Sequence, residues 1–533
     1  MASPRIQGTP PSQDAMLDRL LAIGRRNGVY VGLRDCDLEA EMPLLLNRAG
    51  VPVACMEPSD DFEAVNAHFS AQVHAFFNAL HTLESMADKQ SPDETDLIQK
   101  PEDGGLHAAI RIVNQSYDIY PDCWHRTFYT RRLTVQDPDT LPLLDYVTRL
   151  HVLPAPSSSN EPDMHFVHMR PVSPRVPLGL AARLPHLREL DCPWLWERLP
   201  LAFSSQALRI FSRPWEGPWR DARVEFGRGV RQLMPSLPSS LIKARLWFWR
   251  LNPYGGDADQ AVHVPDLVGA SPSSPSEFEG MDPVSLGLRD LGSCLAELNI
   301  RALITPDLFR SSSWPHMRHL RVEFHPCAPD GRWYFSGPRG EDSYPTGYAV
   351  TREEHYPPGS EDVEETHALM SREEDKFEGD DEMCLERRPD MFRTLPIAER
   401  IDPLLLAFVS SLRRQDTPSL QDAEMFTWLQ WRPSKDRAEE YEGSDEVPPS
   451  EDEDQTVMFR WGVRYDAPDG DGKGKVTWQV GEDWRPGEEV IRAFEELVGG
   501  DGEDMEWEAF EFVGEREIEA DIRNMNKKNQ SPT

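Results

Sequence analysis

The chain has 533 residues, of which 39% are hydrophobic and 28% are charged, and its formal net charge at pH 7 is −36. Its 15 Trp, 22 Phe and 12 Tyr supply enough large apolar side chains for a sizeable core, which excludes a wholly disordered polymer. The negative charge disfavours binding to phosphate backbones and to anionic membranes.

Membrane, secretory and redox signals all point to an intracellular protein. The sequence has no run of about 18 apolar residues, and its N-terminus lacks a basic stretch followed by an apolar segment. The seven cysteines are odd in number, widely spaced and without a Cys-x-x-Cys pair, which argues against disulfides and structural zinc. We therefore expect a cytoplasmic or nuclear location and no membrane partner.

Residues 1–60 are predicted to form an N-terminal helical region. Residues 16–23 have the apolar spacing of a helix, and residues 44–46 form a small leucine cluster. Gly24 and Gly28 interrupt the helical pattern between them.

A short pattern, apolar-x-x-apolar-x-apolar, recurs in residues 61–340 and once more in residues 391–434. Clear copies occupy residues 147–152, 187–192, 295–300, 317–322 and 420–425, and weaker copies occupy residues 80–85 and 243–248. The last three positions alternate as in a short strand, and leucines at helical spacing precede several copies. Stacked helix-then-strand units predict an α/β fold, an irregular leucine-rich-repeat-like solenoid with long loop insertions. The alternative is an ordinary α/β domain with unrelated Leu-rich elements.

Acidic segments separate the last parts of the chain. Residues 341–533 carry a net charge of −29. Residues 341–390 are predicted to be an acidic, disordered insertion, residues 435–455 an acidic linker and residues 520–533 a disordered tail, because dense like charges repel and few apolar residues offset chain entropy.

Residues 456–519 are predicted to form a C-terminal ββαβ cap. Residues 457–465 and 476–480 alternate as the two strands of a hairpin, residues 486–498 form an amphipathic helix, and residues 506–513 follow as a strand. Such a cap would close the open end of the solenoid.

Several stretches resemble F-box-associated, leucine-rich-repeat-like proteins of filamentous fungi, whose function is unknown. The resemblance is carried by residues 314–338, 184–200 and 459–465, and it covers most of residues 140–515. It implies a partner-binding repeat surface and an N-terminal F-box that docks the Skp1 subunit of a ubiquitin ligase. This chain departs from the family in residues 14–48, which lack a Leu-Pro-x-Glu-like opening.

No residue earns a catalytic, cofactor-binding or metal-ligating role from its sequence context. His316, His319, His325 and Cys327 form the densest cluster of potential zinc ligands, but the strand pattern of residues 320–324 places His319 and His325 on one face and His316 on the other. A calcium loop starting at Asp469 fails, because its fifth and twelfth places hold Lys473 and Val480. Motifs of hydrolases, zinc proteases and dinucleotide-binding enzymes are absent.

A basic, aromatic-rich window spans residues 209–250. Its tryptophans are residues 215, 219, 247 and 249, interleaved with arginines that could contact phosphates. The net charge of the chain favours the simpler interpretation that these residues pack within the fold. The sequence therefore predicts a non-enzymatic protein-interaction scaffold or adaptor, in one form the substrate-recognition subunit of a Skp1-cullin-F-box ligase. The alternatives are an enzyme with a site assembled from distant residues, and nucleic-acid binding through this window.

Overall fold

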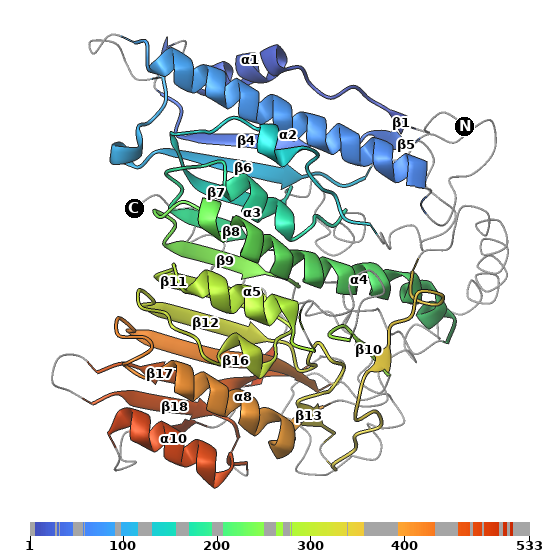
Figure 1. The fold of residues 1–533 in the computed structure, drawn as a ribbon, viewed down its shortest axis with the longest axis vertical. Coiled ribbons are helices and arrows are strands. Elements are labelled where there is room, and N and C mark those ends of the chain that lie inside the picture. Colours follow the sequence, from blue (N-terminus) through green and yellow to red (C-terminus); the bar gives the residue numbers. More distant parts are fainter. Residues whose placement is uncertain are drawn as a thin grey trace.

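A large sheet runs through the whole computed structural model and carries helices along its length (Figure 1). The structure describes residues 6–26, 29–30, 32–45, 57, 59–90, 97–115, 131–155, 170–193, 206–249, 263–269, 278, 280–337, 339–356, 393–431, 457–468, 473–481, 484–499, 505–508 and 512–514. The chain is thus an α/β protein built on one mixed, mostly parallel sheet of 12 strands.

Eleven of the 12 strands lie side by side in the order in which they occur along the chain. From one edge they are β4 (Asp35–Ala40), β6 (Leu106–Ile112), β7 (Val147–Pro154), β8 (Glu189–Cys192), β9 (Lys243–Trp247), β11 (Glu297–Ala302), β12 (His319–Phe324), β16 (Asp422–Trp431), β17 (Val457–Asp466), β18 (Lys475–Gln479) and β19 (Met505–Glu508). All neighbours from β4 to β16 are parallel, β17 is antiparallel to both β16 and β18, and β19 is parallel to β18.

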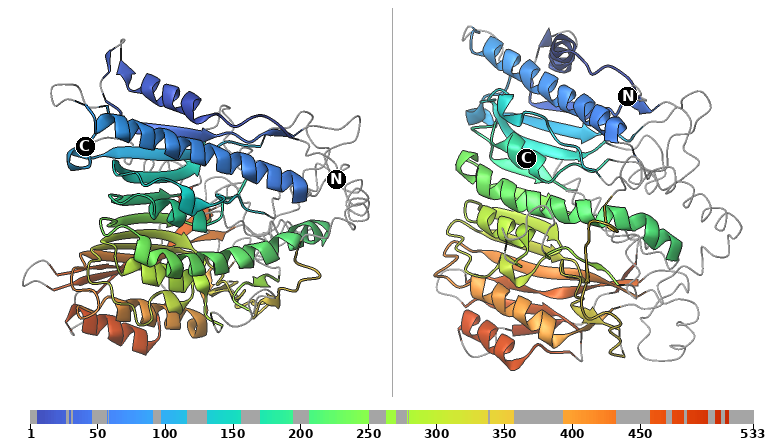
Figure 2. Two further views of the ribbon diagram at one scale, coloured as in Figure 1. Left: turned by 45° about the horizontal axis from the view of Figure 1, so that its top comes forward. Right: turned by 45° about the vertical axis from the view of Figure 1, so that its right-hand side comes forward.

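The main helices lie over one face of the sheet (Figures 1 and 2). They are α2 (Ser59–Ala87), α3 (Arg175–Ala181), α4 (Gln206–Leu233), α5 (Pro283–Gly292), α8 (Ala398–Ser411) and α10 (Glu488–Val498). Crossovers between parallel strands are right-handed in nearly all proteins, so strands added in a single direction place their helices on the same side. No described helix covers the opposite face, which we call the open face.

The recurring pattern aligns across the sheet, and the prediction that its strands lie side by side is confirmed. Leu150 pairs with Leu190, Leu298 with Leu320, and Leu320 with Ala423. These central positions point toward the helices and are buried, as are the apolar positions two residues later in each strand. Each copy therefore adds one strand in register and extends a single continuous core.

Both weaker copies of the pattern were predicted wrongly. Residues 80–85 lie inside helix α2, because an apolar pair three residues apart fits a helical face as well as it fits the repeat. In the copy at residues 243–248, Ala244 and not Leu246 aligns with Leu190 and Leu298, so the true copy begins at Leu241. Strands β4 and β6 were missed, because their central positions hold the small residues Cys36 and Ala108.

The helix predicted over residues 16–23 is confirmed by α1 (Gln13–Ile23), but the other described elements up to Leu45 are not helical. Ser12 caps its start by accepting the Ala15 N–H, and the helix ends at Gly24. The remaining elements are strands: β4, the antiparallel pair β1 (Ile6–Gln7) and β5 (Leu44–Leu45), and the antiparallel pair β2 (Arg25–Arg26) and β3 (Val29–Tyr30). Helix α1 packs on α2, outside the layer that covers the sheet.

The predicted C-terminal hairpin and helix are confirmed by β17, β18 and α10. Helix α10 ends at Gly499, whose φ of 110° suits a residue without a side chain. The strand predicted over residues 506–513 is divided into β19 and β20 (Phe512–Gly514). The first of these extends the sheet beyond β18, and the second pairs with the early part of β17.

Short paired segments lie near the carboxyl ends of the central strands. They are the parallel pair β10 (Pro265–Asp266) and β14 (Tyr348–Ala349), and the antiparallel pair β13 (Phe335–Ser336) and β15 (Leu395–Pro396). Residues 341–356 are thus structured, although the sequence places them in a disordered insertion; Tyr348 and His355 both contact the buried Glu216 of α4. The rest of that insertion, the linker 435–455 and the tail 520–533 lie outside the described residues.

Candidate functional site

The open face carries two rows of polar side chains that arise directly from the repeat. Side chains alternate along a strand, so the residues just before and just after each central apolar position point away from the helices. The first row consists of Arg149, Glu189, Lys243, Glu297, His319 and Asp422. The second row consists of His151, Asp191, Arg245, Asn299, Arg321 and Glu424. Because the strands are in register, each row runs straight across six strands.

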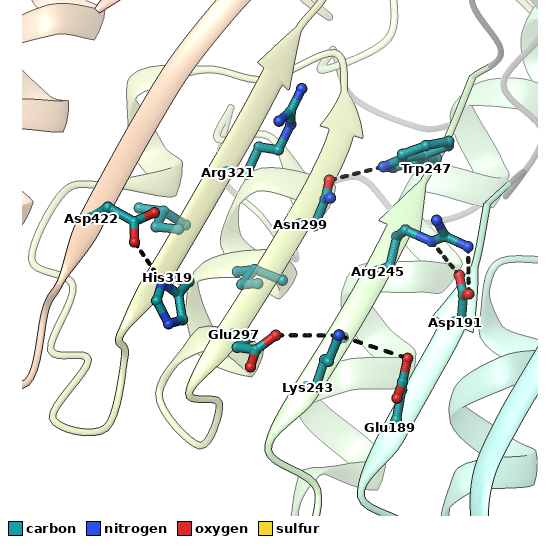
Figure 3. Close-up of a pocket in the computed structure, with 13 residues that line it drawn as sticks. Glu189, Asp191, Lys243, Arg245, Trp247, Glu297, Asn299, His319, Arg321 and Asp422 are labelled. Atoms are coloured by element: carbon teal, nitrogen blue, oxygen red, sulfur yellow. Dashed lines mark hydrogen bonds and ion pairs between the residues drawn. The ribbon is translucent and has the colours of Figure 1, made fainter. Parts of the chain in front are cut away.

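Opposite charges meet along both rows (Figure 3). The Lys243 Nζ lies 4.0 Å from a Glu189 oxygen and 3.3 Å from a Glu297 oxygen. Arg245 donates to both carboxylate oxygens of Asp191, over 2.6 and 2.5 Å. Such cross-strand pairs each contribute roughly 0.2–1 kcal/mol. These charges therefore support the sheet, and those of Glu189, Lys243 and Glu297 remain partly accessible from solvent.

The rows border a hollow of about 340 Å³ on the open face. Its lining residues come from β8, β9, β11, β12 and β16, and Figure 3 shows the polar ones standing on neighbouring strands. Four carboxylates, those of Glu189, Asp191, Glu297 and Asp422, line it together with the basic Lys243, Arg245 and Arg321, and with His319. The hollow is therefore highly charged and nearly balanced, with an excess of one carboxylate when the histidine is neutral.

Trp247 forms the aromatic end of the hollow. Its indole N–H donates to the Asn299 side-chain oxygen over 2.9 Å. The Arg245 and Arg301 guanidinium carbons lie 5.0 and 4.3 Å from the ring centroid, and Arg301 forms a buried ion pair with Glu323. One hydrogen bond and two cation–π contacts therefore fix the orientation of this ring.

The structure does not bring together His316, His319, His325 and Cys327, to which the sequence analysis assigned no metal-binding role. His319 lies on the open face, 2.5 Å from an Asp422 oxygen, whereas His316 is exposed before the strand begins. His325 and Cys327 are buried at the end of β12, where the Cys327 backbone N–H donates to His325 Nδ1. Burial lowers the pKa of His325 to about 4 and raises the pKa of the Cys327 thiol. These residues occupy strand and core positions, as the sequence favoured.

Three tryptophans and two arginines of the Arg/Trp-rich window pack into the fold, whereas Arg231 is exposed. Trp219, Trp247 and Trp249 are each at most 5% exposed. Arg223 forms a buried pair with Asp282 over 2.7 Å, and Arg220 donates to the Val350 carbonyl. These three tryptophans offer no open ring on which a nucleic-acid base could stack.

Sequence reasoning missed a different cluster, formed by His151, Glu189 and Asp191. The signal was available, because these are the outward positions of two adjacent copies of the repeat. Finding it required knowing that β7 and β8 pair directly and in which register.

Comparison of the chain with protein-family models, curated proteins and solved structures finds no match. Among the helices that the structure describes, none has the length and apolar character needed to cross a membrane.

Proposed function

We propose that the chain is a leucine-rich-repeat-like interaction scaffold whose open face binds a Lys/Arg-rich segment of a partner protein. The observation that carries this proposal is the one-sided sheet, in which helices cover one face while charged side chains and a hollow occupy the other. A leucine-rich-repeat-like solenoid is supported by copies of one pattern that align in register across successive parallel strands.

The charge of the molecule favours a basic partner. The hollow has one more carboxylate than basic side chains, and the whole chain carries −36. A field of this sign accelerates the encounter with a positively charged segment and repels polyanions. At the surface, Lys and Arg side chains of the partner would pair with Glu297 and Asp422, which retain substantial exposure.

A direct test measures binding of synthetic peptides to the full-length protein. We expect Lys/Arg-rich peptides to bind and Asp/Glu-rich peptides of equal length not to bind, with affinity that falls as salt is added. Reversing a charge beside the hollow, E297K, should weaken binding roughly threefold to tenfold. The matched control is E496K on α10, which changes the net charge equally but lies among the helices. Equal binding by wild type and E297K, or equal loss in both variants, would contradict the proposal.

The ligase-adaptor form of this role is a separate question. The family resemblance implies docking to Skp1 through residues 1–60, whose described part contains α1 and strands instead of a compact helical module. Co-purification of the full-length chain with Skp1 tests it. A stable complex would support a substrate receptor, and basic-peptide binding without Skp1 would support a plain scaffold.

A further inference from the structure

Three potential metal ligands converge at the β7–β8 end of the open face. They are the ring nitrogen of His151 and carboxylate oxygens of Glu189 and Asp191, and these ligand atoms all lie within 4.8 Å of one another. His151 and Asp191 are direct partners in the parallel pairing of β7 with β8, and Glu189 is two residues before Asp191 on the same face. No other such group occurs among the residues that the structure describes.

The separation between His151 and Asp191 fits two ligands of one metal ion better than a hydrogen bond. His151 Nε2 lies 3.6 Å from Asp191 Oδ2, beyond hydrogen-bond range. Two ligands about 2.1 Å from a tetrahedral zinc ion would lie about 3.4 Å apart. Two other His–Asp pairs are closer, His319 with Asp422 at 2.5 Å and His107 with Asp35 at 3.1 Å.

Two histidine ring nitrogens at this cluster make no hydrogen bond. The Nε2 atoms of His151 and of the adjacent His107 are buried and have no hydrogen-bond partner. Their rings lie 4.2 Å apart in an edge-to-face arrangement, and Asp35 fixes the His107 ring through Nδ1 over 3.1 Å. An imidazole nitrogen that makes no hydrogen bond can bind a metal ion through its lone pair.

Basic neighbours hold the two carboxylates of the cluster to different degrees. Arg245 holds Asp191 through both oxygens and so fixes the orientation of that carboxylate. Glu189 is held only loosely, at 3.9 Å from Arg149 and 4.0 Å from Lys243, and is free to turn toward an ion.

We propose that His151, Glu189 and Asp191 form a binding site for a divalent transition-metal ion such as zinc. Such an ion binds imidazole nitrogen as well as carboxylate oxygen, whereas Mg²⁺ and Ca²⁺ prefer oxygen ligands alone. Three protein ligands leave a coordination position open, and because Glu189 and Asp191 also line the hollow, that position would face a ligand bound there.

The test is calorimetric titration of the full-length, metal-free protein with Zn²⁺, with Mg²⁺ as the comparison ion. We expect Zn²⁺ binding that is weakened at least about tenfold in H151A and in E189Q. The matched control, H319A, removes the histidine that pairs with Asp422 on the same face and should bind Zn²⁺ like the wild type. E189Q alters a partly exposed side chain, so it still tests the site if H151A does not fold.

Absence of Zn²⁺ binding by the wild type would overturn the proposal, as would unchanged binding in H151A and E189Q. An equal loss in H319A would also overturn it, because it would show diffuse binding by surface histidines. The zinc titration contains no partner peptide, so its outcome is independent of the proposed scaffold function.

Discussion

Glu84 shows how a single buried carboxylate links the helical layer to the sheet. It lies near the end of α2 and is 4% exposed. Its two oxygens accept the backbone N–H groups of Asp145 and Tyr146, over 3.0 and 2.9 Å, just before β7 begins. Burial raises its pKa to about 7, although these two hydrogen bonds act in the opposite direction.

This raised pKa makes stability depend on pH. The carboxyl group binds its proton more tightly in the folded state than in the unfolded state, where its pKa is about 4.5. Its stabilising contribution is therefore complete below about pH 4.5 and is lost as pH rises through about 7. Relative to E84Q, which does not titrate, the free energy of unfolding of the wild type should fall by on the order of 3 kcal/mol over that range.

Urea unfolding of both proteins at a series of pH values measures this difference directly. The comparison with E84Q removes the contribution of every other titrating group. Curves that stay parallel from pH 4.5 to pH 8 would show that Glu84 does not carry the dependence.

At the scale of elements, the close approach of α4 to α5 depends on a glycine. A Cβ atom at Gly227 would lie 2.7 Å from the Pro283 carbonyl oxygen and 2.9 Å from the Phe278 ring. Pro283 is the first residue of α5, and Asp282 caps that helix by accepting the Ser285 N–H. Any side chain at Gly227 would therefore push the start of α5 away from α4.

Replacing glycine by alanine should consequently have opposite effects in two helices. G227A should lower the free energy of unfolding by about 1–3 kcal/mol, because the added methyl group overpacks the α4–α5 contact. G179A in α3 should raise it by about 0.5–1 kcal/mol, because the nearest atom to its Cβ is 4.0 Å away and alanine favours the helix. Urea unfolding measures both, and a change of the same sign in both variants would refute the packing argument.

Elements with a local signal could be predicted from the sequence, and those defined by distant pairing could not. Helix α10 and the β17–β18 hairpin were predicted because amphipathic spacing and turn glycines lie within one short segment. Residues 80–85 were misassigned because Leu80 and Leu83 satisfy helix and repeat equally. The division between β19 and β20 is set by pairing with β18 and β17, which no local pattern encodes.

The candidate site could likewise be predicted only where its signal is local in the sequence. The polar residues of both rows could be read as the outward positions of the repeat copies. Their meeting across strands, such as Asp191 with Arg245, required the order and register of the sheet. His107 was missed altogether, because β6 has alanine where other copies have leucine.

At the scale of the whole molecule, stability should be distributed between neighbouring units. Each strand on the main path pairs with the strands beside it, and helices pack in the neighbouring pairs α1–α2, α3–α4, α4–α5 and α8–α10, although the buried cluster runs from Met16 to Val498. In such an array, stability is close to a sum of local and nearest-neighbour terms. A change at one end should therefore loosen that end first.

Trp507 on the edge strand β19 is suited to test this. Its ring stacks on Trp478 of β18 at 5.3 Å, and the Arg485 guanidinium lies 4.3 Å above it. In W507A, backbone amides of β18 and β19 should exchange with solvent at least about tenfold faster, while amides of β4 and β6 at the far edge keep their wild-type rates. Native-state hydrogen exchange measures both ends in one experiment. Equal acceleration at the two ends would mean that the sheet opens as one cooperative unit and that the nearest-neighbour description is wrong.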